Sequence, residues 1–453
     1  MDEEIFLKNN KLDKNDNASK LRADIMSLVE KYSNLSHSEE KFIPGETTVP
    51  VSGKVYSKND LQMLISASLD FWLTAGRFND EFERRLSAFF NKSFVLTTNS
   101  GSSANLLAIT ALTSQKLAER ALSPGDEVIT AAAGFPTTVN PILQNNLIPV
   151  FVDVDIPTYS PTAKMIERAI TEKTKAIILA HTLGNPFEIE EILKIAQEKN
   201  IWIIEDCCDA FGSSYNNKLC GTFGDIATLS FYPAHHITTG EGGALFTRNP
   251  NLFQIIQSFR DWGRDCFCPT GVNNTCGKRF DWKLGELPQG YDHKFIYSHL
   301  GYNLKITDMQ AAVGLAQIKN IEKFISKRRA NFDYLKQKFK GLENFLILPE
   351  PTKNSKPSWF GFPITIRDSN LINKSKLTTK LSERKIDSRP LFAGNITKQP
   401  YLKNQSYKIS GELKNTDKIM NDTFWLGVYP GLDNKKLDYV ASTMNELIIE
   451  FID

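Results

Sequence analysis

Two adjacent histidines, His235 and His236, have a side chain and a setting that suit acid–base chemistry. They stand in the stretch LSFYPAHHITTGEGGAL at residues 229–245, between two β-rich runs and just before a glycine-rich turn. Imidazole titrates near neutral pH, so a histidine at the end of a strand can act as a general base. No lysine occurs between Lys218 and Lys278. No side-chain amine of this stretch can therefore hold a carbonyl compound covalently.

Further residues could bind a phosphate or a charged ring. The sequence SGSSAN at residues 100–105 opens a helix, where Gly101 and Ser102 would offer free backbone N–H groups to an anion. An ordinary helix cap would explain the same residues. Asp206 ends the strand WIIEDCC and lies 24 residues before Ser230, and alone it would be a cap or turn residue. Phe135, in AAGFPTT, alone would be a core residue.

Four cysteines, Cys208, Cys266, Cys268 and Cys276, are separated by 57, 1 and 7 residues. Thiolates in a set of four select zinc or an iron–sulfur cluster. Structural zinc sites usually space cysteines by two to four residues, which disfavours zinc because one residue separates Cys266 from Cys268. A zinc site nevertheless remains the simpler alternative. The remaining cysteines, at positions 207 and 220, are expected to be structural.

The elements that position these residues alternate in type. From residue 94 to about 248, β-rich runs alternate with helical periods, which predicts a mostly parallel sheet covered by helices on both faces. Residues 261–300 break this pattern with three cysteines and several glycines and prolines. We expect an α/β chain with a helical extension at 1–57, a large domain at 58–305 that includes the 261–300 insertion, and a smaller α+β domain at 306–453. Leu21, Ile25, Leu28, Val29 and Tyr32 at helical spacing predict a helix packed outside the main domain.

The composition excludes several classes. A formal net charge of +2 gives no basic surplus for nucleic acid or a membrane surface. The N-terminal sequence MDEEIF does not resemble a secretory signal, and no apolar run reaches the roughly 18 residues of a membrane helix. We expect a cytoplasmic protein with reduced cysteines.

The stretch around the two histidines resembles the cofactor strand pair of the sugar aminotransferases, pyridoxal-phosphate enzymes of fold type I. In that family the fifth residue after the serine is the lysine that holds the cofactor, and here it is His235. The resemblance implies a noncovalently held cofactor, pyridoxamine phosphate or else pyridoxal phosphate. His235 would then be the general base that removes a C4′ proton and promotes loss of a hydroxyl from the neighbouring sugar carbon. His236 would have a structural or supporting role.

The same resemblance assigns the other cofactor contacts. Ser230, with Gly101 and Ser102, would bind the phosphate, Asp206 would pair with the pyridinium nitrogen, and Phe135 would stack on the ring. The remaining assignments are Asp209 as a further cofactor contact and Asn303, in GYNLKITDMQAA, as a residue that reaches the neighbouring subunit's phosphate. A homodimer with shared sites is therefore expected. Arg77 and residues 388–395 resemble stretches near the sugar site.

The cysteine spacing and the stretches SFYPAHHIT and GYDHK resemble the CDP-4-keto-6-deoxyglucose 3-dehydrase family, which makes 3,6-dideoxyhexoses for cell-surface polysaccharide. This resemblance implies a [2Fe–2S] cluster on Cys208, Cys266, Cys268 and Cys276, close enough to pass electrons to the cofactor. The substrate would be a CDP-linked 4-keto-6-deoxy sugar. The chain has no G-x-G-x-x-G nicotinamide fingerprint, so a separate NADH-dependent flavin and iron–sulfur reductase is expected.

Three alternatives remain open. One is a cluster-free 3-dehydratase that acts on a GDP-linked keto sugar and releases ammonia. Another is a noncatalytic aminotransferase-fold protein stabilised by zinc, and a third is a degenerate, inactive aminotransferase. The cysteines argue against the first, and retention of Asp206, Phe135 and Ser230 argues against the loss of cofactor binding.

Overall fold

A large sheet of eight strands forms the centre of the computed structural model, which describes residues 16–36 and 41–452. Its strand order is β1-β9-β8-β5-β4-β2-β3-β14. All strands run parallel except β9, which is antiparallel to both of its neighbours. The bounds are β1 Phe94–Thr98, β2 Glu127–Ala131, β3 Ile148–Val152, β4 Thr174–Ala180, β5 Trp202–Asp206, β8 Ile226–Ser230, β9 Gly243–Thr247 and β14 Lys408–Ser410. The predicted mostly parallel sheet is confirmed.

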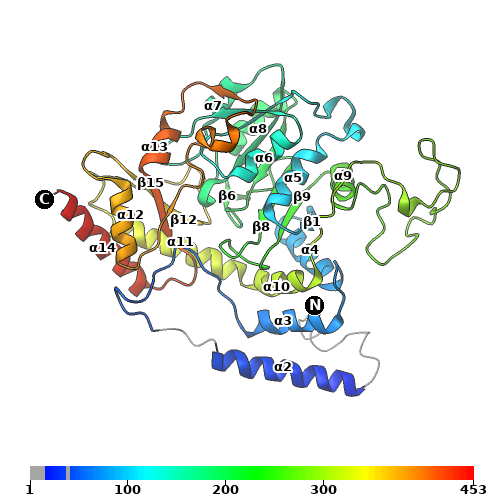
Figure 1. Ribbon diagram of the computed structural model, residues 1–453, viewed down its shortest axis with the longest axis horizontal. Coiled ribbons are helices and arrows are strands. Elements are labelled where there is room, and N and C mark those ends of the chain that lie inside the picture. The colour runs from blue at the N-terminus through cyan, green and yellow to red at the C-terminus, as the bar shows by residue number, and fades with distance from the viewer. Residues whose placement is uncertain (1–15, 37–40, 453) are drawn as a thin grey trace.

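Helices cover both faces of this sheet (Figure 1). Alternate residues of β4 face opposite sides: Ala176 and Ile178 pack with α5 and α9, whereas Ile177 and Leu179 pack with α7 and α8. Successive side chains of a strand point to opposite faces, so a strand buried on both sides is apolar throughout. The helices on the two faces of the sheet are α5 Gly101–Ala111, α6 Pro136–Gln144, α7 Ala163–Ala169, α8 Ile189–Glu198 and α9 Pro250–Arg260, with short 3-10 turns at Gln115–Arg120 and Thr182–Gly184.

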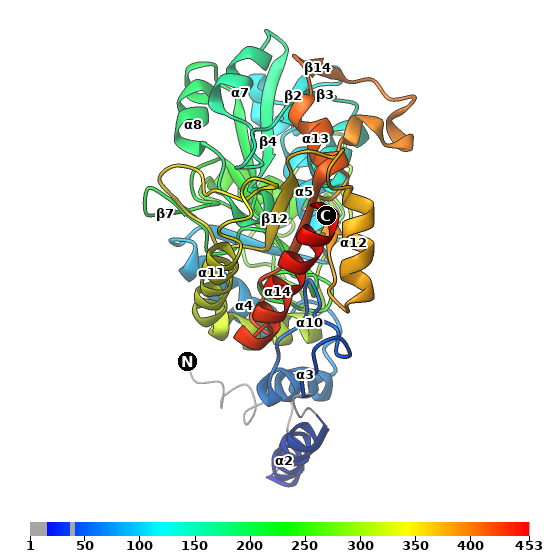
Figure 2. The ribbon, with the colours of Figure 1, turned by 90° about the vertical axis from the view of Figure 1, so that its left-hand side faces the viewer.

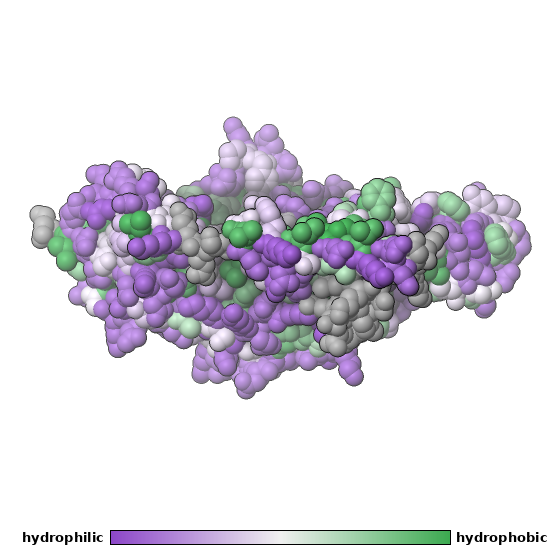
Figure 3. All heavy atoms as spheres, turned by 90° about the horizontal axis from the view of Figure 1, so that it is seen from below, coloured by the Kyte–Doolittle hydropathy of each residue, from purple (hydrophilic) through white to green (hydrophobic). Residues whose placement is uncertain are grey.

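The predicted N-terminal helix is α2, Asp16–Ser36, which packs on α3, Lys58–Asp70. The face that it buries differs from the expected one. Arg22 and Met26 are buried, and Arg22 donates a hydrogen bond of 2.9 Å to Asp70 of α3. Leu21 and Leu28 point outward instead, and Figure 3 shows a row of apolar side chains along this side of the molecule. The buried ion pair between Arg22 and Asp70 determines which face of α2 packs on α3, and the spacing of apolar residues alone does not predict that face.

A smaller antiparallel sheet, in the order β10-β12-β15-β13, forms the C-terminal part (Figure 2). Two elements that follow residue 306, the predicted start of the small domain, pack on the large domain instead. Helix α10 packs on α3 and on α4, Arg77–Phe89, while β14 extends the large sheet beside β3. The remaining bounds are α10 Asp308–Gln317, α11 Ile321–Lys338, α12 Lys374–Glu383, α13 Lys414–Asp422, α14 Asn434–Ile452, β6 Ser214–Tyr215, β7 Lys218–Leu219, β10 Leu346–Ile347, β11 Ser355–Lys356, β12 Gly361–Ile366, β13 Arg389–Pro390 and β15 Thr423–Gly427, with 3-10 turns at His293–Phe295, Ile318–Asn320, Ile396–Lys398 and Pro400–Leu402.

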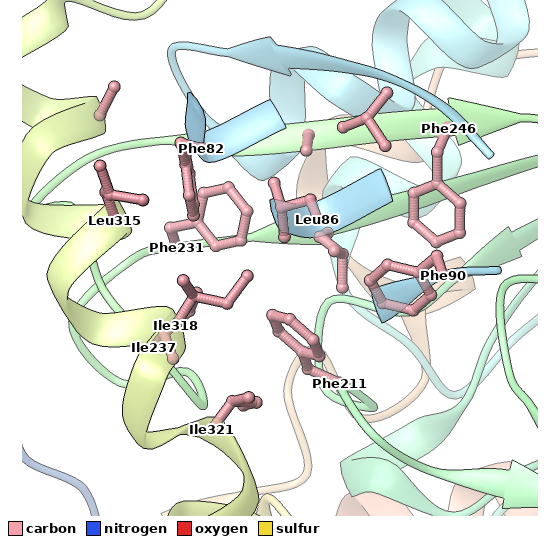
Figure 4. Packing of buried hydrophobic residues seen from close by; sticks show 14 of the residues in the cluster. Phe82, Leu86, Phe90, Phe211, Phe231, Ile237, Phe246, Leu315, Ile318 and Ile321 are labelled. Carbon is pink, nitrogen blue, oxygen red and sulfur yellow. The ribbon is translucent and has the colours of Figure 1, made fainter. Parts of the chain in front are cut away.

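An aromatic core anchors the segment that carries the two histidines (Figure 4). Phe231, just after β8, packs against Phe82 of α4 with ring centroids 5.2 Å apart. Ile237, just after the histidines, is buried in the same cluster. The backbone of Phe231 also bonds to Gly242 and Thr239. The turn that bears His235 and His236 is therefore held at both ends.

The 261–300 segment projects from the body beyond α9, at the right of Figure 1. Its regular structure is limited to the 3-10 turn at His293–Phe295, together with isolated bridges at its base. In the described ranges, no helix combines the length and the apolar character needed to cross a membrane.

Candidate active site

A cavity of about 560 Å³ lies at the carboxyl ends of the parallel strands, where the small domain closes over them. This volume falls within the usual range of small-molecule sites. The cavity brings together predicted residues that are far apart in sequence, namely Gly101, Ser102, Phe135, Asp206, Cys208, Asp209, Ser230 and His235. None of its lining residues is a lysine.

One end of the cavity is built from the first turn of α5 and the end of β8. Ser100 caps α5, and its hydroxyl oxygen accepts a hydrogen bond of 3.0 Å from the backbone of Ser103. A Cβ atom on Gly101 would lie 2.5 Å from the Cβ atom of Ser230. Only glycine allows this approach of helix to strand. The resulting cradle of N–H groups and hydroxyls suits a phosphate.

Asp206, at the end of β5, is buried and held in a fixed orientation. One carboxylate oxygen accepts hydrogen bonds of 2.8 Å from both Asn105 and Thr138, and the other accepts one of 3.1 Å from the backbone N–H of Cys208. Sequence reasoning missed Asn105 and Thr138. The position of Asn105 one helical turn after Gly101 was an available signal, because both residues then lie on one face of α5.

His235 and Asp209 face each other beside Asp206. The Nδ1 atom of His235 lies 3.6 Å from a carboxylate oxygen of Asp209, which is an electrostatic contact too long for a hydrogen bond. Burial, together with the charge of Arg328, lowers the pKa of His235 to about 4. Burial, together with the charge of Asp206, raises the pKa of Asp209 to about 7. At neutral pH the imidazole is therefore neutral and able to accept a proton.

Arg328 of α11 holds the backbone at His235 in place, and the sequence analysis did not predict it. Its buried guanidinium donates hydrogen bonds of 3.2 to 3.3 Å to the backbone carbonyls of His235, Trp359 and Phe360. The ring of Phe360 in turn lies 5.1 Å from the ring of His235. These contacts connect α11 and the start of the small sheet to His235. No local sequence pattern predicts them.

Phe135 presents a half-exposed ring to the cavity, as a stacking residue requires. Phe392, from the 388–395 segment, packs edge-on to it at 5.8 Å. Arg389 of the same segment also lines the cavity and is its one arginine. Arg77, by contrast, is bound to Asp70 through a 2.7 Å hydrogen bond and does not line the cavity.

His236 and Asn303 also lie outside this cavity. His236 is buried and faces the backbone carbonyl of Ser358 at 2.9 Å, which gives it a structural position. Asn303 is exposed at the base of the 261–300 segment, where it forms a bridge with Asp261. Within its own chain Asn303 does not reach the cavity. Its predicted contact with a neighbouring subunit stays a prediction.

The four cysteines predicted as metal ligands do not meet within one chain. Cys208 lines the large cavity, whereas Cys266, Cys268 and Cys276 line a separate small one. Within the described ranges, no three of these four sulfurs lie within 4.8 Å of one another. The resemblance implied that all four thiols bind one cluster close to the cofactor, and within one chain they do not come together because the 261–300 segment projects outward (Figure 1).

A different group, His181, Glu205 and Cys207, does satisfy the metal-ligand distance in the described part of the chain. Glu205 already accepts hydrogen bonds from three backbone N–H groups between residues 221 and 224, and it contacts the His181 ring at 3.1 Å. The hydrogen-bonding capacity of the Glu205 carboxylate is thus used by the backbone of residues 221–224, which gives Glu205 a structural role. Cys207 and Cys220 are both buried, as expected for structural cysteines.

The fold and the cavity define a protein of the pyridoxal-phosphate-dependent aminotransferase fold. The chain belongs to the DegT/DnrJ/EryC1/StrS aminotransferase family, whose model matches residues 55–445. It is 61% identical to the lipopolysaccharide biosynthesis protein RfbH of Salmonella typhimurium, over 95% of this chain and 98% of that protein. It is 50% identical to the dTDP-4-dehydro-2,6-dideoxy-D-glucose 3-dehydratase of Saccharopolyspora spinosa, over 91% and 90% of the two chains.

A solved structure shows the same fold with a ligand of the expected kind. The Escherichia coli GDP-4-keto-6-deoxy-D-mannose-3-dehydratase with bound hydrated pyridoxal phosphate superimposes with a TM-score of 0.80 at 30% identity. The match covers 88% of this chain and all of that one. The relatives thus include sugar 3-dehydratases with a pyridoxal-type cofactor.

Proposed function

We propose that the protein is a pyridoxamine-phosphate-dependent 3-dehydratase of a nucleotide-linked 4-keto-6-deoxy sugar in dideoxysugar biosynthesis. One observation carries this proposal. The cavity is lined by Gly101, Ser230, Asp206 and Phe135 together with His235, which occupies the sequence position of the lysine in the aminotransferases that this stretch resembles, and no lysine lines the cavity. The dehydratase names of two relatives agree with such a site.

The residues present fit the cofactor. The close approach of Gly101 to Ser230 leaves a cradle at one end, and Asp206 is fixed by three hydrogen bonds at the floor. When bound, the cofactor supplies an amine that condenses with the keto sugar and a ring that accepts electrons. The carboxylate of Asp206 would keep the ring nitrogen protonated, and Phe135 would cover one face of the ring.

The side chain of His235 would move the proton. Its lowered pKa keeps the imidazole neutral above about pH 5, so it can take a proton from the carbon beside the amine. Asp209, 3.6 Å away, would stabilise the imidazolium that forms. His235 could then return the proton to the departing sugar hydroxyl. Arg389 would contact an anionic part of the substrate at the mouth of the cavity.

The finer proposal is that the sugar is CDP-linked and that dehydration is coupled to reduction. It rests on the C-x57-C-x-C-x7-C pattern formed by Cys208, Cys266, Cys268 and Cys276, which resembles the cluster-binding 3-dehydrases. A [2Fe–2S] cluster on these thiols would carry electrons from a separate NADH-dependent flavin and iron–sulfur reductase. A homodimer is part of the same proposal, because Asn303 is exposed outside its own cavity.

A second candidate is the cluster-free reaction that ends with release of ammonia. Two observations favour it. The fold matches a GDP-linked sugar dehydratase, and Cys208 stands apart from the other three cysteines within one chain. In this reading the thiols of the 261–300 segment have no part in the reaction.

The visible spectrum and the metal content of protein purified without air separate the candidates. Red-brown protein with two irons and two sulfides per chain supports the coupled reaction. A colourless protein that binds pyridoxamine phosphate and dehydrates the sugar supports the cluster-free reaction. Stoichiometric zinc without cofactor binding would refute the proposed activity.

A further inference from the structure

A second and much smaller cavity also has His235 in its wall. His236 and Arg328 line it as well, together with Lys54 from the segment before α3. Its volume of about 10 Å³ is the space that one water molecule needs. Arg328 and His236 are only 1% and 3% exposed, so polar groups that face this cavity are shielded from bulk solvent. The proposed reaction gives the cavity no role.

Two residues of this wall carry a buried nitrogen atom that has no hydrogen-bond partner among the described residues. These atoms are Nε of Arg328 and Nδ1 of His236. A buried polar atom without a partner is costly, and native proteins rarely leave one unsatisfied. No direct hydrogen bond joins these two nitrogens to each other. A third group between them would satisfy both.

The chemistry of the two nitrogens defines this third group. Nε of a guanidinium always carries a hydrogen and can only donate. Nε2 of His236 faces the carbonyl oxygen of Ser358 at 2.9 Å, and because a carbonyl only accepts, Nε2 carries the ring hydrogen. Burial lowers the pKa of His236 well below its usual value, so the ring is neutral and Nδ1 can only accept. A water molecule can accept from Arg328 and donate to His236 at once, whereas a halide ion cannot donate.

Arg328 connects this cavity to the backbone of His235. Its guanidinium donates to the carbonyl of His235 at 3.2 Å and to the carbonyls of Trp359 and Phe360 at 3.3 Å. The backbone N–H of His235 donates in turn to the carbonyl of Tyr232 at 2.9 Å. Because a guanidinium is a rigid planar fork, a partner at Nε fixes the direction of the other N–H groups. The position of His235 thus depends on what holds Nε.

We infer that one water molecule is a fixed part of this cavity, where it accepts a hydrogen bond from Nε of Arg328 and donates one to Nδ1 of His236, and that Arg328 is thereby a positioning residue for His235. This inference rests on the proposed function only for the role of His235 as the base. It adds a buried water site and a residue that acts on the reaction without touching the substrate.

A crystal structure of the full chain tests the water site. Density should appear within about 2.7–3.2 Å of both nitrogens. A second crystal soaked in bromide should show no anomalous peak there. A bromide peak would show an anion site, and a cavity without density would leave the two nitrogens unlinked. Either result would overturn the inference.

Kinetics of variants at Arg328 test the positioning role, with Arg329 as the matched control. Arg329 also donates to three backbone carbonyls, at 2.8 to 3.2 Å, but none belongs to His235. Arg328→Met should lower kcat by about 10- to 100-fold with little change in KM, because displacing a reacting group by about 1 Å can cost 100-fold. Arg328→Lys keeps the charge and should lose less, and Arg329→Met should keep the wild-type kcat.

A wild-type kcat in Arg328→Met, or an equal loss in Arg329→Met, would overturn the positioning role. If Arg328→Met does not fold, Arg328→Lys decides alone, because it lacks Nε and the planar fork. A wild-type kcat in the lysine variant would then be the contradicting result.

Histidine titration in the cofactor-free protein provides a readout that needs no activity. The chain has six histidines, and His235→Asn identifies the signal of His235 in a sample labelled with ¹⁵N-histidine. The charge of Arg328 contributes to the lowered pKa of His235, so its titration midpoint should rise in Arg328→Met and stay low in Arg328→Lys. The other titratable or charged groups around His235 are the same in both variants, namely Lys54, Asp206, Cys208, Asp209, His236, Glu241 and Arg389.

The two kinds of failure are distinguishable. An unchanged midpoint in Arg328→Met would show that Arg328 does not act on His235. Wild-type protein that holds the water and shows the expected titration, but does not dehydrate the sugar, would refute the proposed function and leave the anchoring of His235 in place.

Discussion

Replacing His235 by asparagine should separate catalysis from folding, and His236 supplies the matched comparison. His235 lines the cavity, and its ring nitrogen Nδ1 has no hydrogen-bond partner among the described residues. Removal of a general base costs about 10²–10⁴ in rate, or about 2.7–5.4 kcal/mol of barrier at 1.36 kcal/mol per tenfold. His235→Asn should therefore retain the cofactor and the thermal transition of the wild type while losing at least 100-fold of its kcat.

His236→Asn should behave in the opposite way. The imidazole of His236 is buried against the carbonyl of Ser358, and the shorter asparagine leaves that acceptor without its partner. An unsatisfied buried group costs about 1–3 kcal/mol, so thermal unfolding should shift down by several degrees. The folded variant should keep most of its kcat.

The assays are single-turnover loss of the sugar 3-hydroxyl, pyridoxamine phosphate titration and calorimetry, each carried out on both variants. Equal losses of kcat in the two variants would refute the assignment of the base to the first histidine. A His235→Asn variant that turns over at the wild-type rate would refute it more directly. Loss of cofactor binding in that variant would show that the histidine holds the cofactor and does not move a proton.

Three more changes follow from the geometry of the cavity. Burial raises the pKa of Asp209 to about 7, so the folded protein binds a proton more tightly there than the unfolded chain, and this contribution to stability falls as the pH rises from about 4 to 7. Asp209→Asn should thus raise the Tm relative to wild type more at pH 8 than at pH 4, and calorimetry showing the reverse order would contradict the burial argument. Asp206→Asn should weaken pyridoxamine phosphate binding by about 10- to 150-fold, because a charge-assisted hydrogen bond contributes about 1.5–3 kcal/mol, and an unchanged Kd would remove the residue from the cofactor site. Gly101→Ala should lower the free energy of unfolding by about 1–3 kcal/mol through the 2.5 Å contact with Ser230, whereas Gly134→Ala, whose new Cβ meets nothing closer than 3.7 Å, should unfold at the wild-type temperature, and equal melting temperatures of the two variants would contradict the close approach.

Much of the cofactor site could be predicted because the functional groups lie at strand ends and one helix start. The α/β alternation places Asp206, Ser230 and Gly101 at the same edge of a parallel sheet, where carboxyl ends of strands converge. The absence of lysine from residues 219–277 could be seen just as directly, since it depends only on residue identity. These features are local in sequence and need no knowledge of the rest of the fold.

Other parts of the site depend on contacts between distant segments. Arg328 and Phe360 reach His235 only because α11 and the small sheet fold back over the strand ends. The pKa values of His235 and Asp209 follow from that closure, because burial is the largest cause of both shifts. No spacing in the chain predicts either effect.

The cysteines show most clearly which features of the site follow from the sequence and which depend on the tertiary structure. Residue types and spacing alone indicated that four thiols could form one soft-metal site, and the resemblance to sugar aminotransferases predicted that His235 takes the place of their cofactor-binding lysine. Only the folded chain revealed that Cys208 faces the cofactor cavity while Cys266, Cys268 and Cys276 stand on a projecting segment. The physical reason is that a count of intervening residues limits how far a loop can reach, whereas its direction is set by the surfaces against which it packs.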